Sequence, residues 1–159
     1  MVDQLRPNPA YIEAVLADAA LSPYRTWMGL GITELECDRA LVVLDIEDHH
    51  LQLRGTVAGG VMASLIDTAT FWSAFVRAPA DAGVANVDLR VNYLEAVPKG
   101  ARRLIAEGRC LRPGRRLSYA EAYVRDERGH VVAHGMSSVL TLAGKGLAID
   151  LPKYLEENE

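Results

Sequence analysis

Residues 55–76 read GTVAGGVMASLIDTATFWSAFV, and this stretch determines how the rest of the chain is arranged. Asp67 is its only charged residue, and nothing after the Gly59-Gly60 pair interrupts a helix. The apolar residues that share one broad stripe of that helix are Val61, Met62, Leu65, Ile66, Ala69, Trp72 and Val76. A helix that is apolar nearly all round is either buried in a core or spans a membrane.

The side chains within this stretch favour a buried helix over a membrane span. Asp67 lies in the middle of it, several hydroxyl side chains accompany it, and strand-like sequence follows. An ionised carboxylate is costly in lipid and also in a protein core. We therefore expect a central helix covered by a sheet, in which a buried Asp67 either serves a functional site or simply bridges backbone groups.

The composition is that of an ordinary globular protein. The chain has 159 residues, a net charge of −4 and 24% charged residues, which predicts a single domain over residues 1–159. No cationic, apolar-cored leader opens the chain, so we expect a cytoplasmic protein with no membrane partner. The mild acidity argues against nucleic acid as a partner, and Cys37 and Cys110 make neither a disulfide framework nor a metal-ligand cluster.

Basic residues are concentrated in one segment of this acidic chain. Residues 99–116 hold seven of the 17 lysines and arginines, with Glu107 as the only acid. Such a local patch indicates either a specific anionic ligand or a solvated strand face that ends in a basic turn.

Turn and capping signals divide the chain into elements. Asn8-Pro9 is an N-cap followed by proline at the first helical position, which predicts a helix over about 9–20. A polar loop over 48–54 leads into the central helix, and residues 144–159 form a short tail. Alternating patterns predict strands at 32–37, 40–47, 85–93, 103–111, 117–125 and 131–142. The tail is expected to dock through Leu147, Ile149, Leu151 and Leu155.

The last four predicted strands are joined by short links, which predicts an antiparallel meander and an α+β class. The first of them alternates strictly, with apolar residues on one face and polar residues on a wet face. The apolar face holds Ala85, Val87, Leu89, Val91 and Tyr93.

The pattern Gln52-x-x-Gly55-Thr56-x-x-Gly59-Gly60, followed by Asp67 on the helix, resembles that of the hotdog-fold acyl-CoA thioesterases. It is most similar to the phenylacetate-degradation and hydroxybenzoyl-CoA thioesterase groups. The segments 87–94 and 114–117 fit the same pattern, and the resemblance covers about 31–142. It implies a hotdog fold, in which an antiparallel sheet wraps around a long central helix, here with a short N-terminal helix added.

The resemblance also implies an activity and a set of residues for it. The activity is hydrolysis of an acyl-CoA thioester to free acid and CoA, without a cofactor. The backbone N–H of Gly59 would polarise the thioester carbonyl at the helix N-terminus. Asp67 would be the catalytic carboxylate, either nucleophile or general base toward water. Gln52 would position the water or the carbonyl, and Asn86 falls where a serine or threonine often supports the site.

Two further features bear on this activity. Arg112, Arg115 and Arg116 either contact the phosphates of CoA or simply flank a hairpin turn. The residue before the glycine pair is usually histidine in the family, and here it is Ala58. Ala58 keeps open a non-catalytic acyl-CoA binding or regulatory protein, whereas a hotdog dehydratase would need a histidine that the central segment lacks.

The histidines do not predict a metal site. His130 and His134 have a spacing that suits zinc on a helix, but along a strand it places them about 13 Å apart. His49 and His50 are adjacent in a loop, and four-ligand sites need more partners than the chain supplies there.

Helix geometry predicts that two subunits build each site. Gly59 and Asp67 are eight residues apart, which separates them by about 12 Å along a helix axis. Both cannot reach one thioester carbonyl, because reacting atoms must lie within about 3–3.5 Å. A two-fold axis that places Gly59 of one chain opposite Asp67 of the other resolves this, so we expect a homodimer or a dimer of dimers, that is, a homotetramer.

Overall fold

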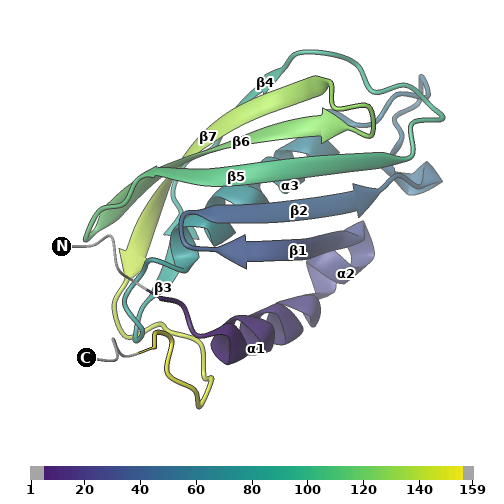
Figure 1. The fold of residues 1–159 in the computed structure, drawn as a ribbon. Helices are drawn as coiled ribbons and strands as arrows, with labels where there is room; N and C mark the ends of the chain where they lie inside the picture. The colour runs from purple at the N-terminus through teal and green to yellow at the C-terminus, as the bar shows by residue number, and fades with distance from the viewer. Residues whose placement is uncertain (1–5, 156–159) are drawn as a thin grey trace.

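The computed structural model describes residues 6–155, which form a hotdog fold with an antiparallel sheet curled around one long helix (Figure 1). The strands are β1 (Leu30–Glu36), β2 (Arg39–Asp45), β3 (Gly83–Asn86), β4 (Arg90–Tyr93), β5 (Arg103–Arg112), β6 (Leu117–Asp126) and β7 (Val131–Leu142). Their order across the sheet is β1-β2-β5-β6-β7-β3, and β4 also pairs with β7. The expected fold class is confirmed.

The central helix α3 (Gly59–Phe75) packs closely against the sheet because two strands carry glycine beneath it. A Cβ atom on Gly108 of β5 would lie 2.2 Å from the carbonyl oxygen of Ala69. A Cβ atom on Gly135 of β7 would lie 2.7 Å from a methyl carbon of Ile66. These separations are far shorter than van der Waals contact, so the two glycines set the distance between helix and sheet.

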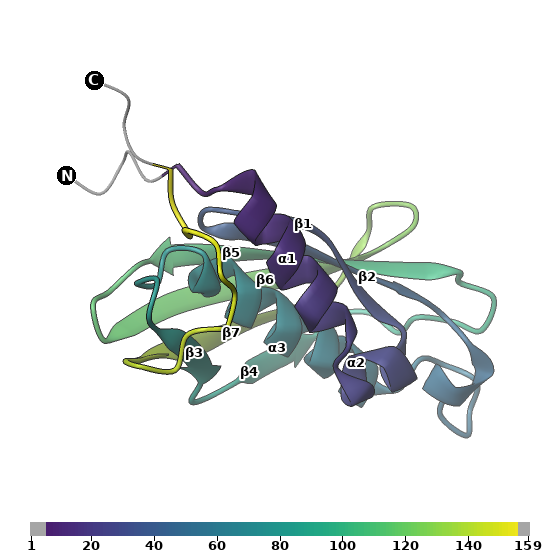
Figure 2. The same ribbon diagram turned by 90° about the horizontal axis from the view of Figure 1, so that it is seen from below.

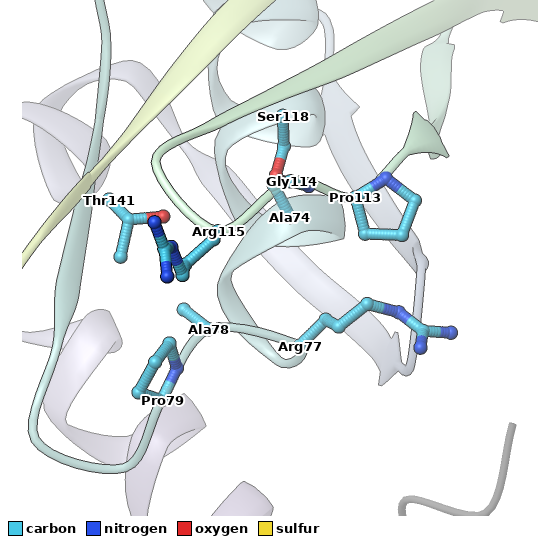
Figure 3. A pocket seen from close by; sticks show the side chains of 9 residues that line it. All are labelled: Ala74, Arg77, Ala78, Pro79, Pro113, Gly114, Arg115, Ser118 and Thr141. Carbon is cyan, nitrogen blue, oxygen red and sulfur yellow. Dashed lines mark hydrogen bonds between the residues drawn. The ribbon is translucent and has the colours of Figure 1, made fainter. Parts of the chain in front are cut away.

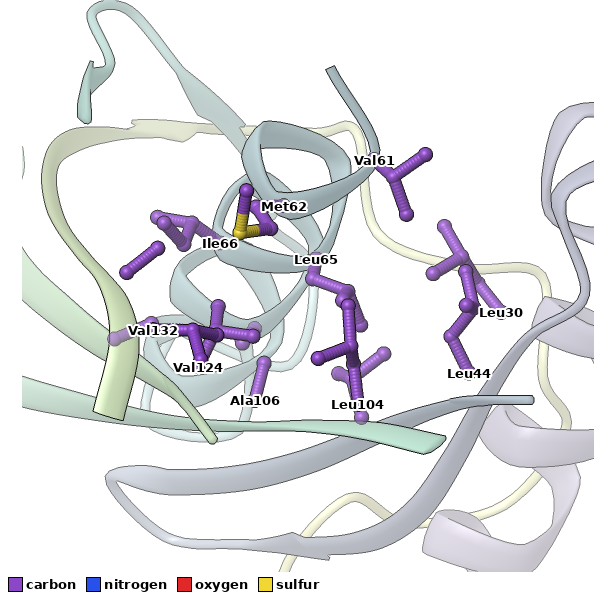
Figure 4. Packing of buried hydrophobic residues seen from close by; sticks show 14 of the residues in the cluster. Leu30, Leu44, Val61, Met62, Leu65, Ile66, Leu104, Ala106, Val124 and Val132 are labelled. Atoms are coloured by element: carbon purple, nitrogen blue, oxygen red, sulfur yellow. The ribbon is translucent and has the colours of Figure 1, made fainter. Parts of the chain in front are cut away.

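The predicted apolar stripe of α3 is the centre of the core. Its N-terminal half packs against β2, β5, β6 and β7, as Figure 4 shows for the side chains around Leu65 and Ile66, both of which are fully buried. Its C-terminal half packs with α1 through Trp72, Phe75 and Val76. Truncation of a buried leucine such as Leu65 typically costs about 2–5 kcal/mol, so this helix carries much of the stability.

Two helices precede the sheet, and only the first was expected. The helix α1 spans Pro9–Ala20, as predicted, and the Asn8 side chain accepts a hydrogen bond from the Ala10 N–H at 3.1 Å. The short helix α2 (Pro23–Met28) follows directly and ends at Gly29, whose φ of 69° is left-handed. Figure 2 shows α1 running along the same side of the sheet as α3, with α2 at its end.

The expected four-stranded meander is wrong in one connection. Strands β5, β6 and β7 are consecutive neighbours, but β3 and β4 pair with β7 rather than with β5. The chain therefore crosses from one edge of the sheet to its middle between Tyr93 and Arg103. Because β5 pairs with β2, the sheet continues through β2 to β1. The helix α3 therefore contacts β1 and β2 as well as β5, β6 and β7.

The predicted strand over 85–93 is interrupted, and its apolar face is not buried as the alternation suggested. Asp88 breaks the ladder, because its carboxylate accepts the Ser138 N–H at 2.7 Å and its carbonyl accepts the Ser137 hydroxyl at 2.7 Å. Val87 and Tyr93 are 55% and 56% exposed at this edge of the sheet. Among residues 6–155, β3 and β4 have a neighbour on one side only.

The tail docks on the end of α3, but mainly through polar groups. Lys153 is buried and its ammonium group donates to the carbonyls of Phe75 and Ala78 at 2.8 and 2.7 Å. These bonds satisfy carbonyls at a helix C-terminus, where a positive charge is favourable. Of the four apolar residues expected to dock, Leu147 and Ile149 are half-buried, whereas Leu151 and Leu155 are exposed. Residues 156–159 lie outside the described part.

Candidate active site

The N-terminus of α3 presents free backbone donors. Ala58 is the N-cap residue and makes no side-chain capping bond. Within residues 6–155, the N–H groups of Gly59 and Gly60 have no hydrogen-bond partner. The ring of Tyr93 lies so close that a Cβ atom on Gly59 would be 3.0 Å from it. Free N–H groups at the positive end of a helix suit an oxygen atom that gains negative charge in a reaction.

Gln52 begins a tight turn that leads into this helix. The Gln52 side-chain amide donates to the Thr56 hydroxyl at 2.5 Å, and the Gly55 N–H donates to the Gln52 carbonyl at 2.8 Å. Gly55 has a φ of 82°, a conformation that only glycine adopts at little cost. The turn holds Gln52 exposed, with its side-chain oxygen free of any partner in the described chain.

Asp67 is exposed, so the expectation of a buried carboxylate is wrong for the single chain. The reason is its place on the helix: its carboxylate leaves the apolar stripe and faces β3. There the Asn86 side-chain amide donates to Asp67 Oδ1 at 2.8 Å and to the Asp67 carbonyl at 2.9 Å. The Thr70 hydroxyl also accepts from this amide at 3.2 Å. The structure thus brings Asp67 and Asn86 together.

The structure does not bring Gly59 and Gln52 to the same place as Asp67 within one chain. Gly59 begins α3 and Asp67 lies eight residues further along it, about 12 Å at 1.5 Å per residue. Gln52 belongs to the Gly59 end through its turn. One chain therefore carries two separate halves of a site. The first is the N-terminus of α3 with its free N–H groups and Gln52, and the second is the Asp67 carboxylate.

A pocket of about 250 Å³ lies beside Asp67, between α3 and the connection from α1 to α2. Its lining includes Asp67, Thr68, Phe71 and Trp72 from α3, and Tyr24 and Arg25 from α2. The Tyr24 hydroxyl is 2.6 Å from the Ser64 hydroxyl, which ties α2 to the central helix. Three aromatic side chains thus line the pocket together with one carboxylate and one guanidinium group.

A second cleft, of about 320 Å³, lies at the other end of α3 (Figure 3). Arg115 reaches across it between Thr141 and Ala78, whereas Arg77 points away toward Asp38, to which it is hydrogen-bonded. Arg112 and Arg116 are exposed on the same β5–β6 turn but do not line the cleft.

The basic segment is partly neutralised. Arg103 pairs with Asp45 at 2.6 Å, and Arg109 pairs with Glu107 at 2.6 Å. The patch expected over 99–116 is therefore smaller than the sequence suggested, since two of its arginines are bound to acids of the sheet. Arg112, Arg115 and Arg116 have no ion pair with any residue from 6 to 155.

His50 precedes the N-terminus of α3 in sequence, but both of its ring nitrogens are engaged in hydrogen bonds. Its ring is buried, Nδ1 accepts the Glu47 N–H at 2.9 Å, and Nε2 lies 2.9 Å from the Met28 carbonyl, to which it donates. Burial lowers the pKa of this imidazole, which keeps the ring neutral. With both nitrogens bound to backbone, His50 organises the loop between β2 and α3 and is not a free acid or base.

The sequence of the chain matches the Thioesterase superfamily over residues 54–133, from the turn before α3 to β7. That match spans half of the chain, and it falls on the elements that carry the glycine pair and Asp67. The chain belongs to this superfamily. As a member it is a hydrolase of the thioesterase type. Within residues 6–155, no helix of this thioesterase has the length and apolarity needed to cross a membrane.

Individual relatives agree with this placement. Rv1847 of Mycobacterium tuberculosis, which carries the provisional name of an esterase, is 29% identical over 126 residues, covering 77% of this thioesterase and 89% of the relative. The phenylacetic acid degradation protein PaaI from Thermus thermophilus, solved as a point mutant, is 27% identical with a TM-score of 0.68, over 75% and 98% of the two chains. A thioesterase family protein from Silicibacter pomeroyi shares the fold, with a TM-score of 0.77 and 24% identity over 84% and 99%.

Three residues around this candidate site were not predicted from the sequence to belong to it. Tyr93 covers Gly59, Thr70 joins the Asn86 contacts, and Arg25 lines the pocket beside Asp67. Thr70 is one turn from Asp67 and could have been found by helical spacing. Arg25 had a weaker signal: Ser22-Pro23 repeats the cap-and-proline start of α1, which marks the helix that carries it.

Proposed function

We propose that this thioesterase hydrolyses an acyl-CoA thioester to the free acid and CoA, with Asp67 as its catalytic carboxylate. The observation that supports this most directly is the placement of Asp67. It is the only charged side chain on α3, it is exposed beside a pocket, and a side-chain amide holds it. An acid that served only packing would not need a dedicated donor on a neighbouring strand.

Two chemical routes fit this carboxylate. As a nucleophile, Asp67 attacks the thioester carbon, CoA leaves as the thiolate, and water then hydrolyses the mixed anhydride. As a general base, Asp67 takes a proton from water while that water attacks the same carbon. Both routes place negative charge on the carbonyl oxygen, which needs donors that Asp67 itself does not supply.

Those donors come from a second subunit in this proposal. The free N–H group of Gly59 in the partner subunit would face Asp67, with its Gln52 nearby, and a two-fold axis makes two such sites per homodimer. The exposed edge at β3 and β4 supports this assembly. Val87, Tyr93 and Leu94 are each more than half exposed there, and the strands are unpaired on that side within residues 6–155. An apolar, unpaired edge is a ready surface for a second copy.

The cleft at the far end of α3 is the proposed site of the CoA phosphates. Arg115 lines it and forms no ion pair with any residue from 6 to 155, so its guanidinium group is available to a phosphate. Arg112 and Arg116 add positive charge on the same turn. Ala74 in the cleft is seven residues from Asp67, which places the two on one face of α3 about 10 Å apart along the axis.

The alternative is a non-catalytic acyl-CoA binding protein, favoured by Ala58 at the N-cap where the family usually has histidine. A dehydratase is disfavoured, because such enzymes need a histidine at the site. The histidine nearest the helix N-terminus in sequence, His50, has both ring nitrogens engaged by the backbone.

The test is turnover of a panel of acyl-CoA esters by the parent and by Asp67→Asn. We expect kcat to fall by at least about 1,000-fold in the variant while KM stays within a few-fold, since the amide keeps the shape but not the charge. Asp81→Asn, a change of another exposed acid, is the matched control and should keep parental turnover. Turnover that is equal in parent and Asp67→Asn would reject this catalytic role, and binding of acyl-CoA without any turnover would support the binding protein.

A further inference from the structure

Arg25 is a largely buried cation that forms no ion pair with any residue from 6 to 155. Its side chain is only 9% exposed, and its Nη1 atom is closed to solvent with no hydrogen-bond partner. Neither a hydrogen bond nor an ion pair joins its guanidinium group to any residue from 6 to 155. Burial lowers the pKa of Arg25, and only the charge of Asp18, which is exposed, opposes that shift. A buried guanidinium nitrogen without a hydrogen-bond partner is costly, and the free chain supplies no partner for Nη1.

The local structure holds Arg25 in that position. The helix α2 begins at Ser22-Pro23 and ends at the left-handed Gly29, so its length is fixed at both ends. The Tyr24 hydroxyl lies 2.6 Å from the Ser64 hydroxyl and ties α2 to α3. The Arg25 guanidinium carbon lies 5.9 Å from the centre of the Trp72 ring, within reach of a cation–π contact.

The pocket that Arg25 lines is also the pocket of Asp67. Trp72, whose ring faces the Arg25 guanidinium carbon at 5.9 Å, follows Asp67 by five residues, about 7.5 Å along the helix axis and about 140° around it. An extended chain of six bonds spans about 7 Å. Phe71 and Trp72 line the same pocket as the two charged groups, and their rings suit methylene groups. The pocket therefore combines a carboxylate, an apolar wall and a guanidinium group that has no ion pair with residues 6–155.

We propose that Arg25 binds a carboxylate at the far end of the acyl group, so that the substrates are CoA monothioesters of short dicarboxylic acids. This inference rests on the proposed hydrolysis of acyl-CoA at Asp67. A guanidinium group matches a carboxylate with two parallel hydrogen bonds, which is the pairing that Arg25 lacks in the free chain. A neutral acyl chain of the same length would leave the cation buried and unpaired.

The pair of substrates that isolates this contact is adipyl-CoA and hexanoyl-CoA, which have equal chain length and differ in the terminal carboxylate. The parent should prefer adipyl-CoA in kcat/KM by at least about 10-fold, the lower range for a hydrogen bond to a charged group. In Arg25→Met the preference should reverse, because Asp67 then repels the second carboxylate. Arg128→Met, a change on the distant β6–β7 turn, should keep both the activity and the preference of the parent.

Two further measurements keep the outcome clear. Arg25→Met should raise the thermal unfolding midpoint in the absence of ligand, since it removes an unpaired buried charge. Adipate itself should bind the parent by calorimetry and not bind Arg25→Met, which tests the contact without any turnover. Asp67-dependent hydrolysis with equal preference in parent and Arg25→Met would overturn the role of Arg25 and leave the hydrolase intact. Absence of hydrolysis would reject the proposed function, and the adipate measurement would then decide the role of Arg25 alone.

Discussion

The side-chain amide of Asn86, on β3, donates a hydrogen bond of 2.8 Å to Oδ1 of Asp67, on α3. The same nitrogen donates to the Asp67 carbonyl at 2.9 Å, so one amide holds both the backbone and the carboxylate of that residue. The amide oxygen of Asn86 is buried and has no partner in residues 6–155. A buried oxygen without a hydrogen-bond partner is destabilising. The side-chain amide of Asn86 nevertheless keeps this orientation, because it directs the nitrogen toward two oxygen atoms of Asp67.

Removal of this donor should slow turnover without weakening substrate binding. Asn86→Ala should lower kcat by about 10- to 100-fold, the range for a hydrogen bond to a charged group, while KM changes little. Asn86→Asp should be worse than Asn86→Ala, because it keeps the shape but sets a second carboxylate against Asp67. Steady-state kinetics of both variants measure this, with Asn92→Ala on the exposed face of β4 as the control. If Asn86 had only a structural role, both variants would lower the thermal unfolding midpoint. The kcat of Asn86→Asp would then be equal to or higher than that of Asn86→Ala.

The sequence was sufficient for the central helix and the class of fold. The apolar stripe through Leu65 and Ile66 could face only a core, and its spacing alone located α3. The cap-and-proline signal at Asn8-Pro9 located α1 to the residue. The pairing of Asp67 with Asn86 needed the family resemblance, because residues 19 apart meet only through tertiary structure.

Other features depend on packing that no local pattern records. The strand over 85–93 alternates correctly, yet it is an edge strand, and Asp88 replaces part of its ladder with side-chain bonds. The exposure of Asp67 follows from its angle around α3 relative to β3, which periodicity leaves undefined. Arg25 reads as a surface residue in sequence, since arginine is rarely buried, and only the fold places it in the pocket.

Arg115 should contribute to binding of the CoA part of the substrate and not to binding of the acyl group. Arg115→Ala should raise KM for acyl-CoA by about 5- to 20-fold, because it removes a charged donor to phosphate, and the parental KM should rise with salt. A short thioester that lacks the nucleotide should show almost no change. Arg128→Ala makes the same change of charge at the opposite end of β6 and should leave both substrates unaffected. Equal effects on the two substrates would show that the β5–β6 turn is merely a solvated basic turn.

His50 should make stability depend on pH below neutrality. Burial lowers its folded-state pKa beneath the unfolded value of about 6.5, so the unfolded chain binds the proton more readily. The contribution of His50 to the free energy of unfolding is therefore complete above about pH 6.5. It is lost as the pH falls through the lowered pKa of His50 in the folded state. Urea unfolding between pH 7.5 and 5 should show this loss in the parent and in His49→Gln. It should be much reduced in His50→Gln, which retains a donor for the Met28 carbonyl but does not titrate.

Gly108 should tolerate no side chain. A Cβ atom there would lie 2.2 Å from the Ala69 carbonyl oxygen and 2.5 Å from its carbon, both backbone atoms of α3. Because the helix must move away from β5 to relieve this, Gly108→Ala should cost about 3 kcal/mol or more in the free energy of unfolding. Gly31→Ala on β1, where the nearest atom is 3.8 Å away, should change it by less than about 0.5 kcal/mol. Equal midpoints for the two variants in denaturant would contradict the close approach of α3.

The shared site predicts that two inactive variants can restore each other. Gln52→Ala damages the half of the site at the N-terminus of α3 and Asp67→Ala removes the carboxylate, so each homodimer should be nearly inactive. After the two are unfolded and refolded together, random pairing gives about half heterodimers, each with one intact and one doubly damaged site under C₂ symmetry. About a quarter of the parental activity should therefore return. A mixture that stays inactive, although mass spectrometry of tagged chains shows that subunits have exchanged, would mean that one chain builds the whole site.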